Sequence, residues 1–583
     1  MGPFSAEGAR DALNRTQAAM LLPAILVGAG SGLGAVGFRW LIEVFTRALS
    51  GHDDYSSAGH ADNPYVPWLG PYFVLLAPVV AGALYGPLVY RYAKEARGHG
   101  VPEVMYAVAR QGGRIPPRVA VVKSLASALC IGGGGSVGRE GPIVQIGAAL
   151  GSTAGALLRV REERMRLLVA CGSAGGIAAT FNAPLAGVFF AMELILRDFT
   201  ARAFGLVAVS AVTASVIGRE ILGDERFLDL APVNAGHLAA YALYVLLGAV
   251  AGAVGVLFSK VLYGVEDLCD SVWHGPEWLR PAAGGIVLGA ILLALPEMYG
   301  VGYPVLGKAA VGGYAIGFLL VLLVGKILAC SVTIGIGGSG GVFAPSLFVG
   351  AMLGSAFGQT MDHLAPGVTG SAMTYAVIGM GAVFAGSARA PITAVVIIYE
   401  LTGEYGIILP LMAAVAVATG VSHALSRDTV YTAKLRRRGV DLDLTGPAAI
   451  EVRTAMGPPP PALASGTGLR EAITVMIEAG AGRLPLVDRH GHYAGSVGAP
   501  ALSRALHAGL SEDTPVEALR DHPPALLAGQ SLQEALPLLA ESEGDGLPVL
   551  DEERLHLVGW VSHRSALQTL HPPAESEDRS ARS

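Results

Sequence analysis

The sequence predicts an all-α polytopic membrane domain with two inverted-topology repeats and broken helices, followed by a cytoplasmic pair of small α/β units. Three observations lead to this prediction. The 583 residues are 52% hydrophobic and only 15% charged, with a mean hydropathy of +0.52, which is far more apolar than a typical soluble protein. Two glycine-rich stretches roughly 200 residues apart read as distorted copies of each other. From about Ala449 onwards the composition becomes that of a soluble domain.

Apolar runs recur along the first part of the chain. Several are shorter than the about 20 residues that span hydrocarbon, and glycine or proline interrupts many of them. We therefore expect tilted and half-membrane helices, with irregular backbone only around a polar pocket, and the number of membrane helices stays open. The main runs cover residues 18–41, 72–89, 201–217, 239–262, 282–295, 317–329 and 407–421.

The two glycine-rich stretches, 132–142 and 335–345, each end in a proline where an apolar helix begins. Each is followed by an Ala-Pro pair with a glutamate nine positions after the proline, Glu193 in the first copy and Glu400 in the second. Helix N-termini present unpaired N–H groups and a partial positive charge. The repeat therefore predicts broken helices that meet within the membrane and bind an anion there.

Charge and composition indicate on which side of the membrane the C-terminal part lies and which kinds of site the chain lacks. The sequence KLRRR at 434–438 directly follows the last apolar run, and the positive-inside rule puts this end in the cytoplasm. The net charge of −6 shows no basic footprint for nucleic acid, and four widely spaced cysteines predict neither a metal site nor a disulfide framework. We predict a membrane domain at 1–432, a basic linker at 433–449, two α/β units at 450–510 and 511–572, and a disordered polar tail at 573–583.

The two α/β units repeat one pattern of a linker, an amphipathic helix and a hydrophobic strand with proline near its start. The strands read LPLVD at 484–488 and LPVLD at 547–551, and a second apolar strand follows each of them. Repeated units that share an apolar face are expected to pack as a pair.

Five ordered motifs now allow a family to be named. The loops GHGVPE (98–103), GREGP (138–142) and GVFAP (341–345) are similar to the three signature loops of the CLC family of chloride channels and chloride/proton antiporters, and FNAPLAG (181–187) and Tyr431 also match in type and order. The soluble tail resembles a tandem of CBS domains. The resemblance covers nearly the whole chain. It implies anion transport rather than an enzymatic activity, with chloride as the substrate, in a homodimer with one pathway per subunit in the cell membrane.

Glu140 is the principal candidate for the gate. An ionisable side chain in an apolar, glycine-rich segment is costly unless it has a function. Beside an anion site, its carboxylate would compete for the same positive potential, so it blocks the pathway when deprotonated and swings away when protonated. The resemblance implies the same role, that of the external gating glutamate. The alternative is a carboxylate that merely pairs with Arg139.

The other candidates come from the same loops. Val342 and Phe343 are expected to contribute backbone N–H groups, and the resemblance implies that the Tyr431 hydroxyl donates to the central anion, although a lone tyrosine near a membrane exit is also typical of an interfacial anchor. Lys123 is a supporting residue that either raises the local positive potential or extends to an interface. The predicted anion-binding residues are His99, Gly100, Gly138, Arg139, Gly141, Val342, Phe343 and Tyr431.

Two departures from the family pattern bear on mechanism. His99 stands where the family commonly has serine, and histidine is bulkier and titrates near neutral pH, so it either changes selectivity and pH dependence or turns its ring aside. Family antiporters usually carry an internal proton-transfer glutamate directly after the residue that matches Glu193, and here that position is Leu194. Glu193, a supporting residue, is an alternative proton-transfer group, but its repeat partner Glu400 suggests that both glutamates are structural and cap or pair helices. Leu194 therefore favours, by a small margin, a passive chloride channel over a chloride/proton antiporter.

Two further alternatives stay open. A CBS-regulated divalent cation transporter is the rival from another class, although divalent cations need clustered oxygen ligands and these loops offer N–H donors. No cofactor is expected in the membrane domain. In the CBS family a hydroxyl and an acidic residue hold the ribose of an adenine nucleotide, and the corresponding positions here are Gly498, Ala501, Ser562 and Ser565. Only Ser562 fits, which leaves nucleotide binding and a purely structural or dimerising tail as alternatives.

Overall fold

The computed structural model describes residues 16, 18–223, 240–364, 371–441, 450–542, 544–551, 553 and 555–570. The chain forms two compact units that divide between Val440 and Asp441. The predicted polar tail at 573–583 and the part of the predicted linker at 442–449 lie outside the described residues.

The first unit is helical, and within its described part seven helices are long and apolar enough to cross a membrane. Four other apolar helices have only 10–17 residues, among them Pro391–Thr402. Helices of this length are too short to span about 30 Å of hydrocarbon, and a helix that ends within it needs packed protein or a polar cavity to satisfy its terminal backbone groups. The predicted mixture of spanning and half-membrane helices is confirmed.

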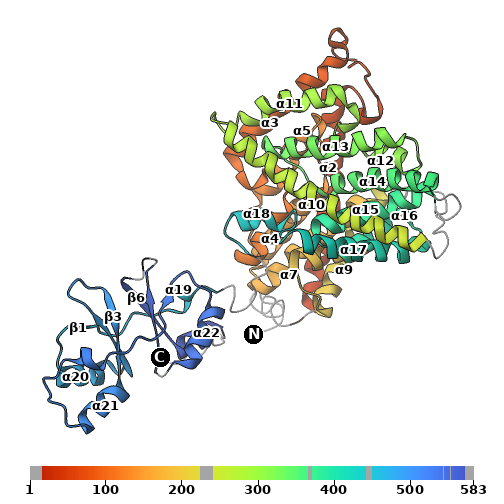
Figure 1. Cartoon of the computed structure of the whole chain (residues 1–583). Helices are drawn as coiled ribbons and strands as arrows, with labels where there is room; N and C mark the ends of the chain where they lie inside the picture. Colours follow the sequence, from red (N-terminus) through yellow and green to blue (C-terminus); the bar gives the residue numbers. More distant parts are fainter. Residues whose placement is uncertain are drawn as a thin grey trace, which may run out of the picture. The chain divides into compact units, whose positions relative to one another are not determined.

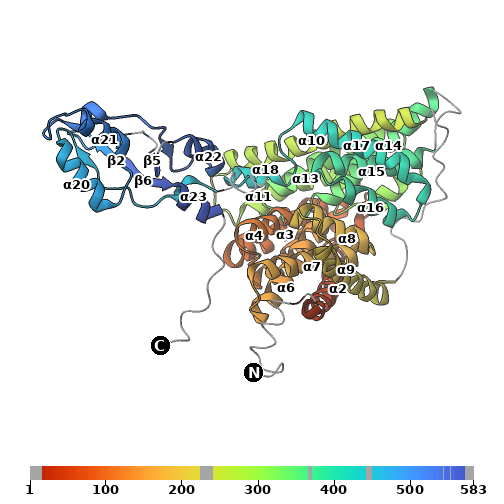
Figure 2. The same ribbon diagram turned by 90° about the horizontal axis from the view of Figure 1, so that it is seen from below.

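The helices of this unit fall into two halves, which Figure 2 shows side by side, the first in red to yellow and the second in yellow-green to teal. The first half contains α2 (Leu21–Ser50), α3 (Phe73–Tyr92), α4 (Val101–Arg110), α5 (Arg118–Gly132), α6 (Glu140–Leu158), α7 (Glu162–Phe181), α8 (Pro184–Phe190) and α9 (Ala201–Leu222). The second half contains α10 (Ala240–Val272), α11 (Arg280–Ala294), α12 (Tyr303–Ala310), α13 (Ile316–Gly335), α14 (Phe343–Leu364), α15 (Ala372–Ala388), α16 (Pro391–Thr402), α17 (Ile408–Leu425) and the short α18 (Thr432–Arg437).

The same packing device recurs in both halves, between α2 and α9 and between α10 and α17. A Cβ added at Gly32 would lie 3.0 Å from the Ala214 carbonyl oxygen, and one added at Gly252 would lie 2.6 Å from that of Ala418. Glycine permits such close helix contact, and close packing rather than the hydrophobic effect drives helix association in lipid. The two halves therefore share a fold, as the two predicted repeats require.

The second unit, drawn in blue in Figure 1, contains two three-stranded sheets with identical topology. In each sheet a two-residue strand pairs parallel to the middle strand, which pairs antiparallel to the third strand through a bulge. The predicted helix and two strands per unit are confirmed, and the short parallel strands were not predicted. The elements are α19 (Val452–Ala455), β1 (Leu463–Ala464), α20 (Leu469–Ala479), β2 (Arg483–Val487), β3 (Tyr493–Gly498), α21 (Ala499–His507), β4 (Leu526–Leu527), α22 (Leu532–Glu541), β5 (Gly546–Leu550), β6 (Leu557–Ser562) and α23 (His563–Leu570).

Candidate functional site

The three glycine-rich loops meet inside the membrane unit. The Gly138 N–H donates to the Gly341 carbonyl oxygen at 2.7 Å, and the Gly341 N–H donates to that of Gly138 at 2.6 Å. This pairing is antiparallel, as expected when two equivalent residues of inverted repeats approach across a two-fold axis. The third loop joins them, because the Gly98 N–H donates to the Gly338 carbonyl oxygen at 3.0 Å. The helix starts at α4, α6 and α14 are thereby held at one place.

Glycine is required where these loops touch. A Cβ at Gly100 would lie 2.7 Å from the Gly141 carbonyl oxygen, and one at Gly341 would lie 2.7 Å from the Gly141 nitrogen. Gly100 also has a φ of 85°, which L side chains rarely adopt. The loops can therefore bring their backbone N–H groups together only with glycine at these positions.

Glu140, the first residue of α6, is buried with 1% of its surface exposed. Its Oε2 accepts a hydrogen bond from the Ala344 N–H at 3.3 Å, in the first turn of α14. Its Oε1 accepts a hydrogen bond from the Tyr303 hydroxyl at 2.5 Å. A helix N-terminus stabilises negative charge, so the carboxylate occupies the position that the loops would offer to a free anion.

Arg139 also contacts Tyr303. Its guanidinium carbon is 5.1 Å from the centre of the Tyr303 ring, and its Nη2 is 3.5 Å from the Thr180 carbonyl oxygen. Arg139 therefore contacts the tyrosine that binds Glu140, and the carboxylate itself is held by Ala344 and Tyr303. These contacts differ from the alternative in which the Glu140 carboxylate merely pairs with Arg139.

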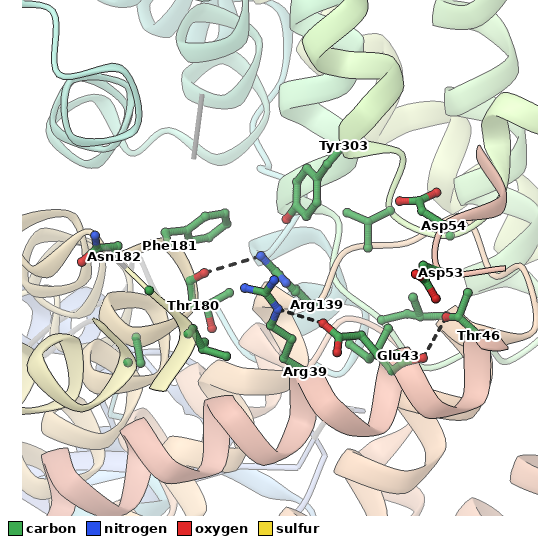
Figure 3. Close-up of a pocket in the computed structure, with 18 of the residues that line it drawn as sticks. Arg39, Glu43, Thr46, Asp53, Asp54, Arg139, Thr180, Phe181, Asn182 and Tyr303 are labelled. Atoms are coloured by element: carbon green, nitrogen blue, oxygen red, sulfur yellow. Dashed lines mark hydrogen bonds and ion pairs between the residues drawn. The ribbon is translucent and has the colours of Figure 1, made fainter. Parts of the chain in front are cut away.

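A pocket of about 380 Å³, here called the vestibule, opens beside Arg139 and Tyr303 (Figure 3). Its wall is strongly charged, and Arg39 and Glu43 form an ion pair across 3.0 Å within it. Arg139 and Tyr303 thus connect a polar cavity to the buried carboxylate. The residues labelled in Figure 3 that line the vestibule are Arg39, Glu43, Thr46, Asp53, Asp54, Arg139, Thr180, Phe181, Asn182 and Tyr303.

Lys123 holds the loop that carries His99. Its side chain is completely buried, and its Nζ donates to the Ala96 carbonyl oxygen at 2.9 Å and to the Gly98 carbonyl oxygen at 2.8 Å. Lys123 therefore does not extend to an interface. It fixes the entrance to α4 from behind the loops.

Lys326 holds a loop in the second repeat in the same way. It lies as many residues after Lys123 as Gly341 lies after Gly138, so the two lysines are at corresponding positions of the repeats. It is buried, and its Nζ donates to the carbonyl oxygens of Gly300 and Val301 at 3.1 and 3.0 Å. Each repeat thus has a buried lysine that fixes the loop before its short helix, α4 in one case and α12 in the other.

His99 is completely buried, and its ring lies edge-on to that of Tyr263, with 6.1 Å between the ring centres. Among the described residues, neither of its ring nitrogens has a hydrogen-bond partner. A buried polar group left in this condition costs about 1–3 kcal/mol. The imidazole is therefore ready to bind a polar ligand or an ion.

Tyr431 is also buried, so it is not an interfacial anchor. It precedes α18, and it lies close enough to Glu140 for electrostatic interaction. The adjoining residue fixes its backbone, because the Tyr263 hydroxyl donates to the Val430 carbonyl oxygen at 2.6 Å and the Val430 N–H donates to that of Ser387 at 2.9 Å.

Glu193 caps a helix of the other repeat. Its carboxylate accepts hydrogen bonds from the N–H groups of Ile392 and Thr393 at 3.1 and 2.8 Å and from the Thr393 hydroxyl at 2.7 Å, at the N-terminus of α16. Glu400 in turn accepts from the N–H groups of Leu185 and Ala186 at 3.0 and 2.7 Å, at the N-terminus of α8. The two repeats therefore cap each other, and Leu194 beside Glu193 is a buried apolar side chain.

Three residues of the site were not among those predicted from the sequence, namely Tyr303, Lys326 and Ala344. A signal for the first was present, because GVGYP at 300–304 repeats the pattern of GHGVP at 98–102. The common separation of the two buried lysines is a signal for the second. The role of Ala344 follows only from the direction in which the Glu140 side chain turns.

Comparison with known proteins adds independent findings. The model of the family described as "Voltage gated chloride channel" matches residues 81–423, and that of the CBS domain matches 451–508 and 516–572. The "Putative chloride channel protein ClcB-like" of Ralstonia nicotianae is 34% identical over 74% of this chain and all of its own length. The "H(+)/Cl(-) exchange transporter ClcA" of Yersinia pseudotuberculosis is 33% identical over 73% of this chain and 90% of its own length.

Solved structures agree on the fold. The crystal structure of a slow cyanobacterial Cl−/H+ antiporter matches 73% of this chain and 99% of its own, with 28% identity and a TM-score of 0.65.

Proposed function

Because this chain belongs to the voltage-gated chloride channel family, whose members move anions across membranes, we propose that it transports chloride and that Glu140 is its external gate. The observation that supports this proposal most directly is the position of the Glu140 carboxylate, held by the Ala344 N–H at the start of α14 and by the Tyr303 hydroxyl. A carboxylate and a chloride ion have the same charge, so they exclude each other from one set of N–H donors.

Protonation is the event that opens this gate. A neutral carboxyl group loses most of its attraction to the N-terminus of α14, because that attraction is electrostatic. The side chain then leaves the site, and chloride takes its place among the converging N–H groups. These groups carry partial rather than full charges, so they bind chloride weakly enough to release it again.

The chloride moves in exchange for protons in this proposal. Relatives named as exchange transporters and the neighbouring antiporter structure support exchange. These relatives and this structure do not support the preference for a passive channel, which rested on Leu194. Glu193 is engaged at the N-terminus of α16, so the cytoplasmic proton route would use groups other than a glutamate at positions 193 or 194.

The experiment is flux in proteoliposomes that contain the purified protein. A chloride gradient should drive protons uphill, and chloride efflux should rise as the external pH falls. Glu140→Gln should make efflux independent of external pH and abolish proton movement. The matched control is Glu220→Gln, which removes an exposed carboxylate of α9 and should keep both properties. Steep pH dependence in Glu140→Gln would overturn the gate, and chloride flux without proton movement in the wild type would overturn exchange.

We also propose that the chain works as a homodimer in the cell membrane with its CBS pair in the cytoplasm. The basic segment after α17 supports this orientation. Its Arg437 pairs with Asp267 at 2.6 Å and its Arg438 pairs with Glu103 at 2.8 Å, which ties the exit of the last membrane helix to α10 and α4.

For the CBS pair we propose a structural role without a bound nucleotide. The Ser562 hydroxyl, which alone matches the nucleotide-binding pattern, accepts a hydrogen bond from the Ser565 N–H at 3.0 Å as a cap of α23. Arg483 of the first CBS unit is largely buried and pairs with Asp521 of the second unit at 2.5 Å. Isothermal titration of the full chain with ATP, ADP and AMP should give no heat of binding, and a saturable signal would refute this role.

A further inference from the structure

Tyr303 joins the gate carboxylate to the vestibule. Its hydroxyl donates to Glu140 Oε1 at 2.5 Å, and its ring lies 5.1 Å from the Arg139 guanidinium carbon. Figure 3 shows Tyr303 and Arg139 close together at the pocket that both residues line. The phenol therefore lies between the cavity and the buried carboxylate.

The backbone that carries Tyr303 is fixed. Gly302, with a φ of 84°, makes the turn into α12, and Pro304 occupies the first turn of that helix. The buried Nζ of Lys326 donates to the carbonyl oxygens of Gly300 and Val301. The hydroxyl is thus presented to Glu140 from a rigid support, which favours a directional hydrogen bond.

From this arrangement we propose that Tyr303 is a latch on the external gate, which holds the deprotonated Glu140 carboxylate in the anion site and releases it on protonation. A hydrogen bond to a charged acceptor is about twice as strong as one to a neutral acceptor, so the latch distinguishes the two protonation states of Glu140. Tyr303 is a positioning residue, because it acts through Glu140. The proposal rests on the gating function proposed above.

The corresponding position of the first repeat cannot form such a latch. Val101 occupies the position that corresponds to Tyr303, and its side chain cannot donate a hydrogen bond. The hydroxyl donor is therefore present at this position in the second repeat and not in the first. It introduces an asymmetry into a site whose glycine loops are otherwise related by the repeat.

The substitution Tyr303→Phe tests this latch without changing any charge. Among the described residues, the groups in electrostatic range of Glu140 include Arg139, Tyr303, Lys326 and Tyr431. Phenylalanine keeps the ring and its packing against the Arg139 guanidinium, and removes the neutral hydroxyl that donates to Glu140 and also interacts with Arg139. A change in gating that disappears when Glu140 is also replaced is then attributable to the lost hydrogen bond to the carboxylate.

The measurement is chloride efflux from proteoliposomes as a function of external pH. Loss of a hydrogen bond to a charged group should move the midpoint of activation to higher pH by about 1–2 units, with the maximal rate at low pH unchanged. Tyr299→Phe is the matched control. Its buried hydroxyl donates to the Gly132 carbonyl oxygen at 2.7 Å, so it also loses a phenol hydrogen bond, and its midpoint should not move.

A second comparison separates this proposal from the one it rests on. Glu140→Gln should remove the pH dependence, and adding Tyr303→Phe to it should change nothing further, because no carboxylate remains to be held. An unshifted midpoint in Tyr303→Phe, with the expected behaviour of Glu140→Gln, would overturn the latch alone. Retained pH dependence in Glu140→Gln would overturn the gate itself, and equal shifts in Tyr303→Phe and Tyr299→Phe would also refute the latch.

Discussion

The reciprocal caps of Glu193 and Glu400 provide a prediction with a magnitude. Glu193→Ala removes a carboxylate that accepts from two backbone N–H groups and one hydroxyl of α16, and leaves those donors without their acceptor. A helix cap contributes about 0.5–2 kcal/mol, and hydrogen bonds to a charged group contribute about 1.5–3 kcal/mol. We expect Glu193→Ala to lower the free energy of unfolding by about 2–3 kcal/mol.

Glu400→Ala is the matched variant, because it removes the equivalent cap from α8 with two N–H donors and no hydroxyl. Its loss should be smaller than that of Glu193→Ala by about one ordinary hydrogen bond, or roughly 1 kcal/mol. Since α8 and α16 are in contact, the two losses are not expected to add simply. Denaturant unfolding of the detergent-solubilised protein, followed by tryptophan fluorescence, measures both.

A third variant, Glu193→Gln, decides whether Glu193 relays protons. A structural cap predicts that Glu193→Gln lowers stability moderately and keeps the ratio of protons to chloride, as measured by pH-sensitive dye and chloride electrode in one preparation. If Glu193→Gln kept full stability and chloride flux but lost proton movement, the capping account would be refuted and Glu193 would be a proton-transfer group.

Other predictions follow from the loops and from the second unit. Lys123→Met removes one donor each from the carbonyl oxygens of Ala96 and Gly98, which keep the Ser339 hydroxyl and the Gly340 N–H, and should reduce stability by about 2 kcal/mol in the same unfolding assay. Lys260→Met on the exposed face of α10 should have little effect. His99→Ser replaces a buried ring whose nitrogens have no partner among the described residues, so it should keep stability and change the ratio of nitrate flux to chloride flux. An unchanged flux ratio would show that the ring does not face the anion. In the second CBS unit, the His556 side chain lowers the pKa of Asp551 through a hydrogen bond. The stability from this contact is therefore present above the ordinary aspartate pKa of about 3.9 and is lost as the pH falls through the lowered value, so His556→Ala should raise the Asp551 pKa in an NMR titration.

The repeated motifs predicted much of this fold because they carry local physical requirements. Glycine loops followed by proline mark helix starts wherever they occur, and their repetition predicted two halves whose helix starts meet. The positions of Glu193 and Glu400 were equally visible in the sequence. The sequence did not show that each glutamate caps a helix of the other repeat, because this contact depends on how α8 and α16 pack together.

The environment of Glu140 could be predicted only in part. The sequence predicted that Glu140 lies at a helix start, but the direction of its side chain is set by Tyr303, which lies 163 residues further along the chain. Pairing over such a distance follows from the fold rather than from a local pattern. The coupling of chloride to protons is a second example, because the single change at Leu194 favoured a channel while the relatives include exchange transporters.

The central claim is that Glu140 and a halide ion compete for the same N–H groups at the start of α14. The most direct test is a crystal structure of Glu140→Gln grown in bromide, located by anomalous scattering. We predict a bromide peak within hydrogen-bonding distance of the Ala344 N–H, where the carboxylate lies in the wild type, and no peak there in wild-type crystals at high pH. Bromide bound in both proteins at that position, or only at sites away from the three loops, would contradict the claim.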